Sequence, residues 1–510
     1  MSKKIMCLFL ALLFVISSLA GCAGKGSSNE GAKDTANGEP SEINFDEEPY
    51  TVNFLYLVGM EGTDQQKVND AVNELTLKEL NMKVNMIPMT FGTYMSQLPL
   101  MLSSGEALDI FPAMANQFAT YIESKYIVNC DDYAAYTKDI YAALGEDAAA
   151  GYVGDFLVGF SNVKERSYPA GLVCRKDIFE ELGYKVEDFY ADNQYGVDFD
   201  KVTELFAAVK AAHPEMICLD GTSTMGLQTE SYGDNMGNNF GYLEGYGQTT
   251  KVTNWFESDE YRMFAEINRD WFTSGYVSTD IAVNSDSGEI KMKAGNCFSY
   301  ISNVKPNTDI EKLAQTGYEV VVVPLSKPMK HTNAVTADLL VVANAAEDKV
   351  KAFQFLNWTY KSREFNDLIN WGIEGLDWVE NEEGMACYPE GVDASNVGYH
   401  NDFGWIYPNQ MVGHPWVGNP ANIWEIYAEY NASTTKSQAF GFMFNSVPVE
   451  TEIAQLNSVY EQYYKDVAFG VIDVDQGIAD FNKALYDAGL QRVIDEKQRQ
   501  LDEWLANKDK

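Results

Sequence analysis

The sequence predicts an α/β protein with two lobes and a helical C-terminal end. Strand-like apolar runs alternate with helical patterns from Tyr50 onward, and the alternation restarts after Pro169. The last 65 residues show helical spacing only. We expect two lobes because the 461 residues after Pro49 exceed a single hydrophobic core, which stops growing near about 250 to 300 residues.

The first lobe is predicted to begin with a βαβαβ unit. Residues 51–58 are β-branched, aromatic and nearly all apolar, which is typical of a strand buried on both faces of a parallel sheet. Further strands are predicted at 83–88 and 108–114, with amphipathic helices between the three strands. This order predicts right-handed crossovers, a parallel sheet and a ligand crevice at the carboxyl ends of the strands.

The remaining elements follow the same logic. A short apolar stretch at 170–174 leads into a helix, and 318–324 and 337–343 have the composition of buried strands. Three helices are predicted near the C-terminus from apolar residues at helical spacing. They cover residues 448–467, 475–488 and 490–505.

The first 21 residues have the layout of a secretory signal. Lys3 and Lys4 precede an apolar run of 12 residues, against the roughly 20 needed to span a bilayer as a helix. The tetrapeptide Leu19-Ala20-Gly21-Cys22 resembles the lipobox of bacterial lipoproteins, which implies that Cys22 carries a lipid and becomes the mature N-terminus. Residues 22–49 are rich in Gly, Ser and Asn and predict a flexible, lipid-anchored tether.

Composition and motifs exclude several classes of function. The 75 acidic residues against 37 Lys and Arg make nucleic acid an unlikely partner, because no basic stripe is available to displace counterions. The four histidines lack paired metal-ligand spacing, so we expect no metal site. Neither GxSxG nor GxxxxGK[ST] occurs, and no cofactor is expected. The five cysteines after Cys22 are expected to be buried thiols rather than a disulfide framework.

Aromatic residues are concentrated in one region. Six of the nine tryptophans fall between Trp358 and Trp424. The C–H faces of a sugar ring stack on indole rings, and sugar hydroxyls bind amides and carboxylates. Trp371 and Trp405 are the predicted ligand platforms, near Glu374 and Asn409 respectively, with core packing as the alternative. Gly372 and Gly375 predict tight turns that would present Trp371 and Glu374 at a cleft edge.

Several segments together resemble the extracellular solute-binding proteins of carbohydrate-type ABC transporters. The last third of the chain is similar to the branch that carries a DUF3502-type C-terminal domain. The segments that carry the resemblance are the lipobox and tether, Ser104-Gly-Glu-Ala-Leu-Asp-Ile110, Tyr168-Pro-Ala-Gly-Leu-Val-Cys-Arg-Lys-Asp177, Lys293-Ala-Gly-Asn-Cys-Phe-Ser-Tyr-Ile301, Ala337-Asp-Leu-Leu-Val-Val-Ala343, Trp371-Gly-Ile-Glu-Gly375 and Gly441-Phe-Met-Phe-Asn445.

The resemblance implies a two-lobe, type II periplasmic-binding-protein-like fold with inter-lobe crossings near Tyr168, Lys330 and residue 364. Lobe 1 would contain residues 50–166 and 331–363, and lobe 2 residues 167–330 and 364–445. Residues 446–510 would form a helical segment packed on the lobes.

The function implied is capture of a sugar or oligosaccharide between the lobes and its delivery to ABC transporter permease subunits. The chain would be a lipid-anchored monomer on the extracytoplasmic face of a bacterial membrane, and not an enzyme. Two alternatives remain open, a lipid-anchored glycoside hydrolase and a cell-surface adhesion or chaperone module, because 75 acids leave room for a catalytic carboxylate pair.

Eight residues are predicted to bind the ligand. Asn116 comes from the resemblance, although the family's usual small polar residue in the loop after the third strand is not clear at 113–117. The full set is Glu61, Asn116, Asp234, Asp338, Trp371, Glu374, Trp405 and Asn409.

The lipobox generates the first testable prediction. Cys22→Ser removes the thiol that would accept the lipid, so the protein is expected in the medium or as an unprocessed precursor. Mass spectrometry of the mature N-terminus of the native protein measures this directly. An unmodified N-terminus beyond Cys22 would contradict the prediction.

Overall fold

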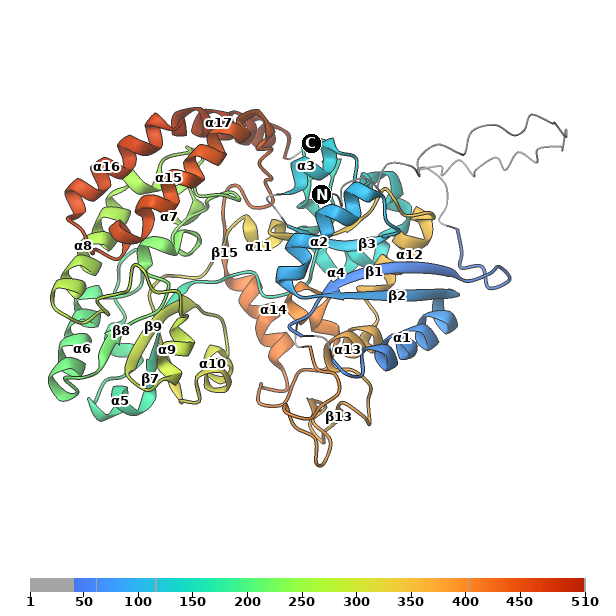
Figure 1. Cartoon of the computed structure of the whole chain (residues 1–510), viewed down its shortest axis with the longest axis horizontal. Helices are drawn as coiled ribbons and strands as arrows, with labels where there is room; N and C mark the ends of the chain where they lie inside the picture. Colours follow the sequence, from blue (N-terminus) through green and yellow to red (C-terminus); the bar gives the residue numbers. More distant parts are fainter. Residues whose placement is uncertain (1–40, 61, 115–116, 402, 509–510) are drawn as a thin grey trace, which may run out of the picture. The chain divides into compact units, whose positions relative to one another are not determined.

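The computed structural model describes residues 41–60, 62–114, 117–401 and 403–508. The predicted signal, Cys22 and the tether up to residue 40 lie outside the described residues, as do Glu61 and Asn116. Two mixed sheets each carry their own hydrophobic core (Figure 1), here called the first core and the second core. In the described part of the chain, no helix is both long and apolar enough to cross a membrane.

The first sheet has the strand order β2-β1-β3-β12-β6. β1 pairs in parallel with β2 along its whole length, from Tyr50 opposite Met82 to Leu57 opposite Met89. β3 also runs parallel to β1, whereas β12 is antiparallel to both β3 and β6. The predicted strands are confirmed. The sheet is mixed and not wholly parallel, because β12 runs in the opposite direction to its two neighbours. The strands are β1 (Tyr50–Leu57), β2 (Met82–Met89), β3 (Ile110–Met114), β6 (Phe160–Ser161) and β12 (Asp338–Val342).

The helices of the first core use the apolar spacing seen in the sequence. In α2, for example, the buried residues are Tyr94, Leu98, Met101 and Leu102, which recur every three to four positions. Thr90 caps the start of this helix, and Gly105 ends it in the left-handed conformation. The helices are α1 (Gln65–Leu80), α2 (Phe91–Ser104), α3 (Phe118–Glu123), α4 (Lys138–Leu144), α12 (Lys349–Thr359) and α13 (Arg363–Trp371).

The second sheet has the order β10-β7-β9-β8, with β7 antiparallel to both of its neighbours and β8 parallel to β9. Its strands are β7 (Ala170–Arg175), β8 (Ile217–Leu219), β9 (Cys297–Asn303) and β10 (Val320–Pro324). The helices around it are α5 (Lys176–Glu181), α6 (Phe199–Ala212), α7 (Glu244–Gly247), α8 (Asp259–Thr273), α9 (Gly288–Lys293) and α10 (Thr308–Thr316).

Four of the five cysteines after Cys22 are buried, as predicted. Cys174, Cys218 and Cys297 lie on strands of the second sheet and Cys130 in the first core, while Cys387 is half-buried. Burial raises the pKa of Cys218 to about 12, so this thiol stays protonated at neutral pH.

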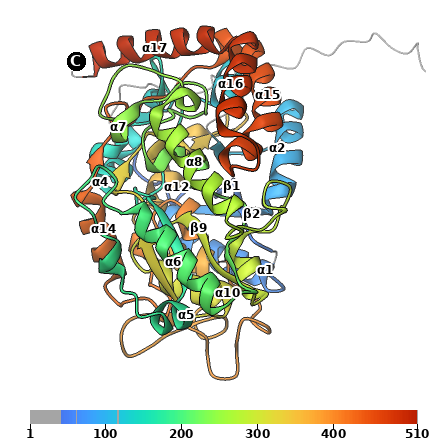
Figure 2. The same cartoon turned by 90° about the vertical axis from the view of Figure 1, so that its left-hand side faces the viewer.

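The C-terminal helices belong to the second core. Their buried residues, among them Leu456, Phe481 and Leu501, pack in the second core. α15 and α16 also contact α8, and Figures 1 and 2 show the helices lying together. The segment therefore packs on one core, whereas the sequence predicted packing on both lobes. The helices are α15 (Glu450–Ala468), α16 (Val474–Asp487) and α17 (Leu490–Asn507).

The predicted assignment of residues 364–445 to lobe 2 needs correction. Phe365, Ile369 and Tyr407 are buried in the first core, and the ring of Phe365 lies 6.1 Å from that of Phe54 on β1. The reason is that α13 packs against α1, which turns its apolar face toward the first sheet. The chain enters the second core only near Ala439.

The third crossing between the cores also differs from the expected position at residue 364. β11 (Met329–Lys330) and β15 (Thr435–Lys436) form a parallel two-stranded ribbon, with Met329 opposite Thr435. Two crossings therefore run side by side, one leading to α11 (Asn333–Thr336) and the other following α14 (Ile423–Ser433). Residue 168 lies between β6 of the first sheet and β7 of the second, and Lys330 lies in β11, so the crossings near these two residues stay predictions at those positions.

The last part of the predicted tether is held by the first core. The side-chain amide of Asn81 donates to the carbonyls of Asn44 and Glu47, both at 2.9 Å. Gln354 donates to the carbonyl of Ser41 at 2.9 Å. These bonds correct the predicted end of the tether at residue 49, because residues 41–49 are bound to the body.

The packing of the C-terminal helices generates a prediction on stability. Phe481 is fully buried, and its ring lies 4.7 Å from that of Phe256 and 5.6 Å from that of Tyr463. Phe481→Ala is expected to lower the free energy of unfolding by about 3 to 5 kcal/mol, because it opens a cavity in the second core. Denaturant unfolding followed by tryptophan fluorescence measures the change.

Tyr486→Ala on the same helix is the matched control, because Tyr486 is 37% exposed. It is expected to cost no more than about 1 kcal/mol. Equal losses in the two variants would show that α16 does not belong to the second core.

Candidate functional site

The ends of the first sheet's strands define the candidate site. β1, β3 and β6 run in one direction, so their carboxyl ends and the amino end of β12 share one edge of the sheet, here called the carboxyl edge. Asp338, the first residue of β12, stands opposite Met114 at the end of β3. Such edges bind ligands in α/β proteins. The predicted residues Glu61 and Asn116 follow β1 and β3 in sequence but lie outside the described residues.

Asp338 is part of a polar cluster at this edge. Its side chain is 10% exposed, and the ammonium of Lys164 lies 3.3 Å from its Oδ1. The amide of Asn162 donates to its Oδ2 at 2.5 Å. Asn162 and Lys164 come directly after β6, which pairs with β12. The ammonium of Lys164 neutralises the carboxylate of Asp338 at the start of β12, and the amide of Asn162 orients it. Asp338 was predicted from the sequence as a ligand contact, whereas its partners Lys164 and Asn162 were not predicted.

Trp405 presents the exposed aromatic face at the carboxyl edge. It lies in η8 (Gly404–Ile406) and is 41% exposed, while the amide of Asn162 donates to its carbonyl at 2.5 Å. The ammonium of Lys164 lies 5.4 Å from the centre of its ring, within the range of a cation–π interaction. The segment is anchored by Tyr407, whose hydroxyl donates to the carbonyl of Leu57 at 2.9 Å.

The segment that leads from the first core to the second is buried and charged. Lys164, Glu165, Arg166 and Ser167 are at most 7% exposed. The carboxylate of Glu165 binds the ammonium of Lys305 at 2.9 Å and the amide of Gln410 at 2.8 Å. Burial alone would raise the pKa of Glu165, but the Lys305 ammonium holds the pKa below its usual range.

These contacts connect both sheets to the carboxyl edge. Lys305 follows β9 of the second sheet, and Gln410 belongs to η9 (Gln410–Val412), close to Trp405 in sequence. Arg166 donates to Asp147 at 3.0 Å and to the carbonyl of Ala334 at 2.8 Å. The only sequence signal for this network was a run of charged residues immediately before Tyr168-Pro169, where the alternation of strands and helices begins again.

Two residues that were predicted to bind the ligand form hydrogen bonds to other parts of the chain instead of facing the carboxyl edge. Asp234 is fully buried, and its Oδ2 accepts the backbone N–H of Thr332 at 2.8 Å. Asn409 is 5% exposed, donates to the carbonyl of Tyr360 at 2.8 Å and accepts from the N–H of Met411. Their polar atoms are engaged within the protein, and a role of either residue in ligand binding stays a prediction.

The predicted pair of Trp371 and Glu374 also needs correction. Trp371 is 6% exposed, its indole N–H donates to the carbonyl of His414 at 3.0 Å, and its ring lies 4.9 Å from that of Trp416. Gly372 adopts the expected positive φ of 87°. That turn, however, directs Trp371 into a packed aromatic cluster and leaves Glu374 exposed, because burying the indole satisfies both its apolar face and its N–H.

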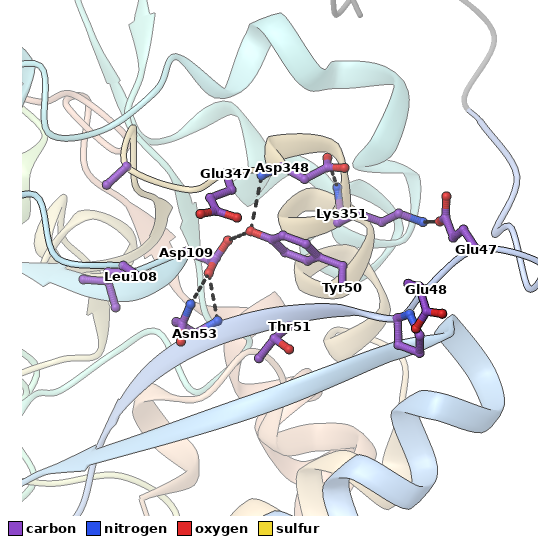
Figure 3. A pocket seen from close by; sticks show the side chains of 13 residues that line it. Glu47, Glu48, Tyr50, Thr51, Asn53, Leu108, Asp109, Glu347, Asp348 and Lys351 are labelled. Carbon is purple, nitrogen blue, oxygen red and sulfur yellow. Dashed lines mark hydrogen bonds and ion pairs between the residues drawn. The ribbon is translucent and has the colours of Figure 1, made fainter. Parts of the chain in front are cut away.

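A cavity of about 540 Å³ lies at the opposite end of the first sheet (Figure 3). Its lining includes Glu47, Glu48, Asp109, Glu347 and Asp348 from the amino end of β1 and its surroundings. Burial raises the pKa of Asp109, although the Tyr50 hydroxyl and the Asn53 amide donate to its carboxylate. Within the described ranges, no group of three or more His, Cys, Asp or Glu side chains is arranged to hold a metal ion.

Comparison with protein families identifies the class of protein. A model described as bacterial extracellular solute-binding protein matches residues 70–373. A second, described as a domain of unknown function (DUF3502), matches residues 438–506. The chain belongs to the bacterial extracellular solute-binding protein family. Members of this family bind a solute without chemical change, which removes the hydrolase alternative.

Individual relatives agree with this assignment. A carbohydrate ABC transporter substrate-binding protein of Streptococcus pneumoniae serotype 4 is 22% identical over 468 residues, covering 89% of this chain and 91% of the relative. The crystal structure of the N-glycan transport solute-binding protein NgtS from Streptococcus pneumoniae is 19% identical, with a TM-score of 0.77, covering 90% of this chain and 100% of that one.

NgtS in complex with Man5GlcNAc has a TM-score of 0.67 and 19% identity, covering 90% of this chain and 99% of that one. These likenesses confirm the predicted two-lobe periplasmic-binding-protein-like fold with C-terminal helices.

The two tryptophans can be separated by experiment. Trp371→Ala is expected to lower the free energy of unfolding by about 3 to 5 kcal/mol, because it empties a packed aromatic cluster and leaves the His414 carbonyl without its donor. Trp405→Ala removes a ring that is 41% exposed, and is expected to cost about 1 kcal/mol or less. Thermal or denaturant unfolding of both variants compares them, and similar losses would contradict the assignment.

Proposed function

We propose that this chain captures an oligosaccharide at the carboxyl edge and delivers it to the permease subunits of an ABC transporter. The observation that carries the proposal is Trp405, an exposed indole held beside the ion pair of Lys164 and Asp338. A sugar ring offers C–H faces to an aromatic ring and hydroxyls to charged groups, so this arrangement suits both halves of its chemistry. The side-chain amide of Asn162 is a further polar group beside Asp338 and Trp405.

The relatives support the class of ligand. One is named as a carbohydrate ABC transporter substrate-binding protein, and NgtS has been crystallised with Man5GlcNAc. The strongly acidic composition, with a net charge of −38, suits a neutral or cationic solute better than an anionic one. No observation in the structure favours an adhesion or chaperone role.

The mechanism is binding and release. We propose that the first core and the second core are the two lobes, built from residues 41–161 with 338–434 and from residues 170–328 with 437–508. A ligand at the carboxyl edge lies next to the crossing residues Glu165 and Lys305, so it can contact both lobes. It then stabilises the closed arrangement by its higher affinity for that state.

The proposal includes the location of the protein. A lipid on Cys22 would hold the chain on the extracytoplasmic face of the membrane. The tether would extend to about residue 40, because Ser41 and Asn44 are bound to the first core. The chain is proposed to act as a monomer, with the permease as its membrane partner.

Calorimetry with Man5GlcNAc, preceded by a glycan array to find tighter ligands, tests the proposal on the chain from Ala23. Wild type is expected to bind a glycan and to show a smaller radius of gyration in solution scattering when saturated. Trp405→Ala is expected to weaken binding by about 1 to 3 kcal/mol, because the stacking face is lost.

Tyr190→Ala is the matched control, since Tyr190 is a 57% exposed aromatic residue outside the carboxyl edge. It is expected to leave the affinity unchanged. Failure of every glycan to bind would reject the saccharide as ligand, and unchanged affinity in Trp405→Ala would move the site away from this edge.

A further inference from the structure

A lysine in the C-terminal helices is buried in an unusual environment. Lys497 of α17 is fully buried, and its ammonium has four oxygen atoms around it. The carbonyl of Asn235 lies at 3.0 Å, the side-chain oxygen of Asn238 at 3.0 Å, the carbonyl of Asn238 at 3.4 Å and that of Gly241 at 3.3 Å. The loop of residues 234–243 therefore wraps around a cation supplied by the chain itself.

The backbone conformation of this loop turns its oxygen atoms toward Lys497. Met236 adopts a positive φ of 50°, and Gly237 and Gly241 have φ values of 95° and 117°. A Cβ on Gly241 would lie 2.9 Å from Cδ of Lys497, so the lysine stem needs glycine at this point. Several oxygens turn toward one centre. The carbonyls of Asn238 and Gly241 would lose this donor without Lys497, whereas the Asn235 carbonyl also accepts from the N–H of Asn238, and the Asn238 side-chain oxygen also accepts from the N–H of Phe240.

The same loop holds the crossing between the cores. Asp234, at its start, accepts from the N–H of Thr332 at 2.8 Å, and the Thr332 hydroxyl lies 2.7 Å from the same carboxylate oxygen. That hydroxyl is also 2.6 Å from the carbonyl of Ala439, which follows β15. The side-chain oxygen of Asn235 accepts from the amide of Asn333 at 3.3 Å. Two of the three crossings thus meet at this loop.

We propose that Lys497 is a positioning residue through which the C-terminal helices hold the crossing segments. The amino group of Lys497 sets the conformation of residues 234–243 by donating hydrogen bonds, and Asp234 and Asn235 transmit that conformation to Thr332 and Asn333. A neighbouring contact acts in the same direction, because Gln498 accepts from the N–H of Val252 at 2.7 Å. The role assigned to the DUF3502 segment is to brace the crossing segments, which is independent of the ligand.

Hydrogen exchange on the whole mature chain tests the proposal. Lys497→Met keeps the length of the side chain and removes the charge. Peptides covering 229–243 and 329–337 are expected to exchange at least about tenfold faster than in wild type, because the loop carbonyls lose their donor. The peptide covering β1 serves as internal reference and is expected to keep its rate.

Lys483→Met is the matched control. Lys483 lies on α16, its side chain is 75% exposed, and it pairs with Asp487 at the surface. It is expected to leave both peptides at wild-type rates. Faster exchange confined to 229–243 in Lys497→Met would overturn the proposal, because the effect would not reach the crossing. Unchanged exchange in both peptides would overturn it as well.

A second variant guards against failure of Lys497→Met to fold. Thr332→Val removes the hydroxyl from the crossing side of the contact. Coupling between two sites is reciprocal, so residues 234–243 are expected to exchange faster in this variant too. Wild-type exchange in that loop would contradict the coupling.

The pH dependence of hydrogen exchange distinguishes a positioning role of the Lys497 amino group from simple packing of its side chain. Burial lowers the pKa of Lys497 to about 7, and the Asp234 carboxylate opposes this shift. The neutral amine still has two N–H groups to donate to the loop oxygens. The closed loop binds a proton less readily than the open loop, in which the lysine is solvated, so closure is favoured as the pH rises above 7. Protection of 229–243, corrected for intrinsic exchange, is expected to rise by up to about tenfold per pH unit between pH 7 and 9. In Lys497→Met this dependence should vanish, and a flat wild-type profile would contradict the role of Lys497.

Discussion

The arrangement of the molecule depends on how three buried charges are paired. Lys164, Glu165 and Arg166 pass between the two cores in succession, and each is at most 7% exposed. A buried charge without a partner costs several kcal/mol, so each of these side chains needs a counterion at the right place. The partners are Asp338 at the start of β12, Lys305 after β9 and Asp147 of η3 (Gly145–Ala149). Three distant parts of the chain are therefore held to one short segment.

The candidate site follows from this constraint. Because Lys164 is drawn to Asp338, its ammonium lies over the ring of Trp405, and Asn162 holds the Trp405 backbone. Glu165 adds Gln410 from the same aromatic segment. The indole of Trp405 is thus held at the surface beside polar groups. The cavity at the amino end of β1 is lined by acidic residues and lies at the other end of the sheet, away from this network.

The C-terminal helices extend the same principle. Lys497 is another buried basic side chain, and oxygens of the loop 235–241 surround its amino group. Asp234 and Thr332 then carry the contact to the crossing segments. The helices pack in the second core and, through this loop, touch the connection to the first.

Local sequence patterns determined the elements and the class of protein. Strand boundaries at β1, β2, β10 and β12 and the three C-terminal helices fell within a few residues of the predictions, because each has an apolar period that local packing obeys. The order of the segments was enough to indicate the solute-binding family. Asp338 and Trp405, both predicted as ligand contacts, lie at the carboxyl edge in the structure, and their binding of a ligand stays a prediction.

Tertiary structure alone decided which side chains face that edge. Trp371 and Trp405 look alike in sequence, each beside a glycine, yet one fills an aromatic cluster and the other is exposed. Asp234 and Asn409 were predicted as ligand contacts because they are polar, but their partners, Thr332 and Tyr360, are distant in sequence. Whether a polar side chain faces the site or the protein interior depends on such long-range hydrogen-bond partners. Local periodicity therefore carries no information about it, and α13 joined the first core for the same reason.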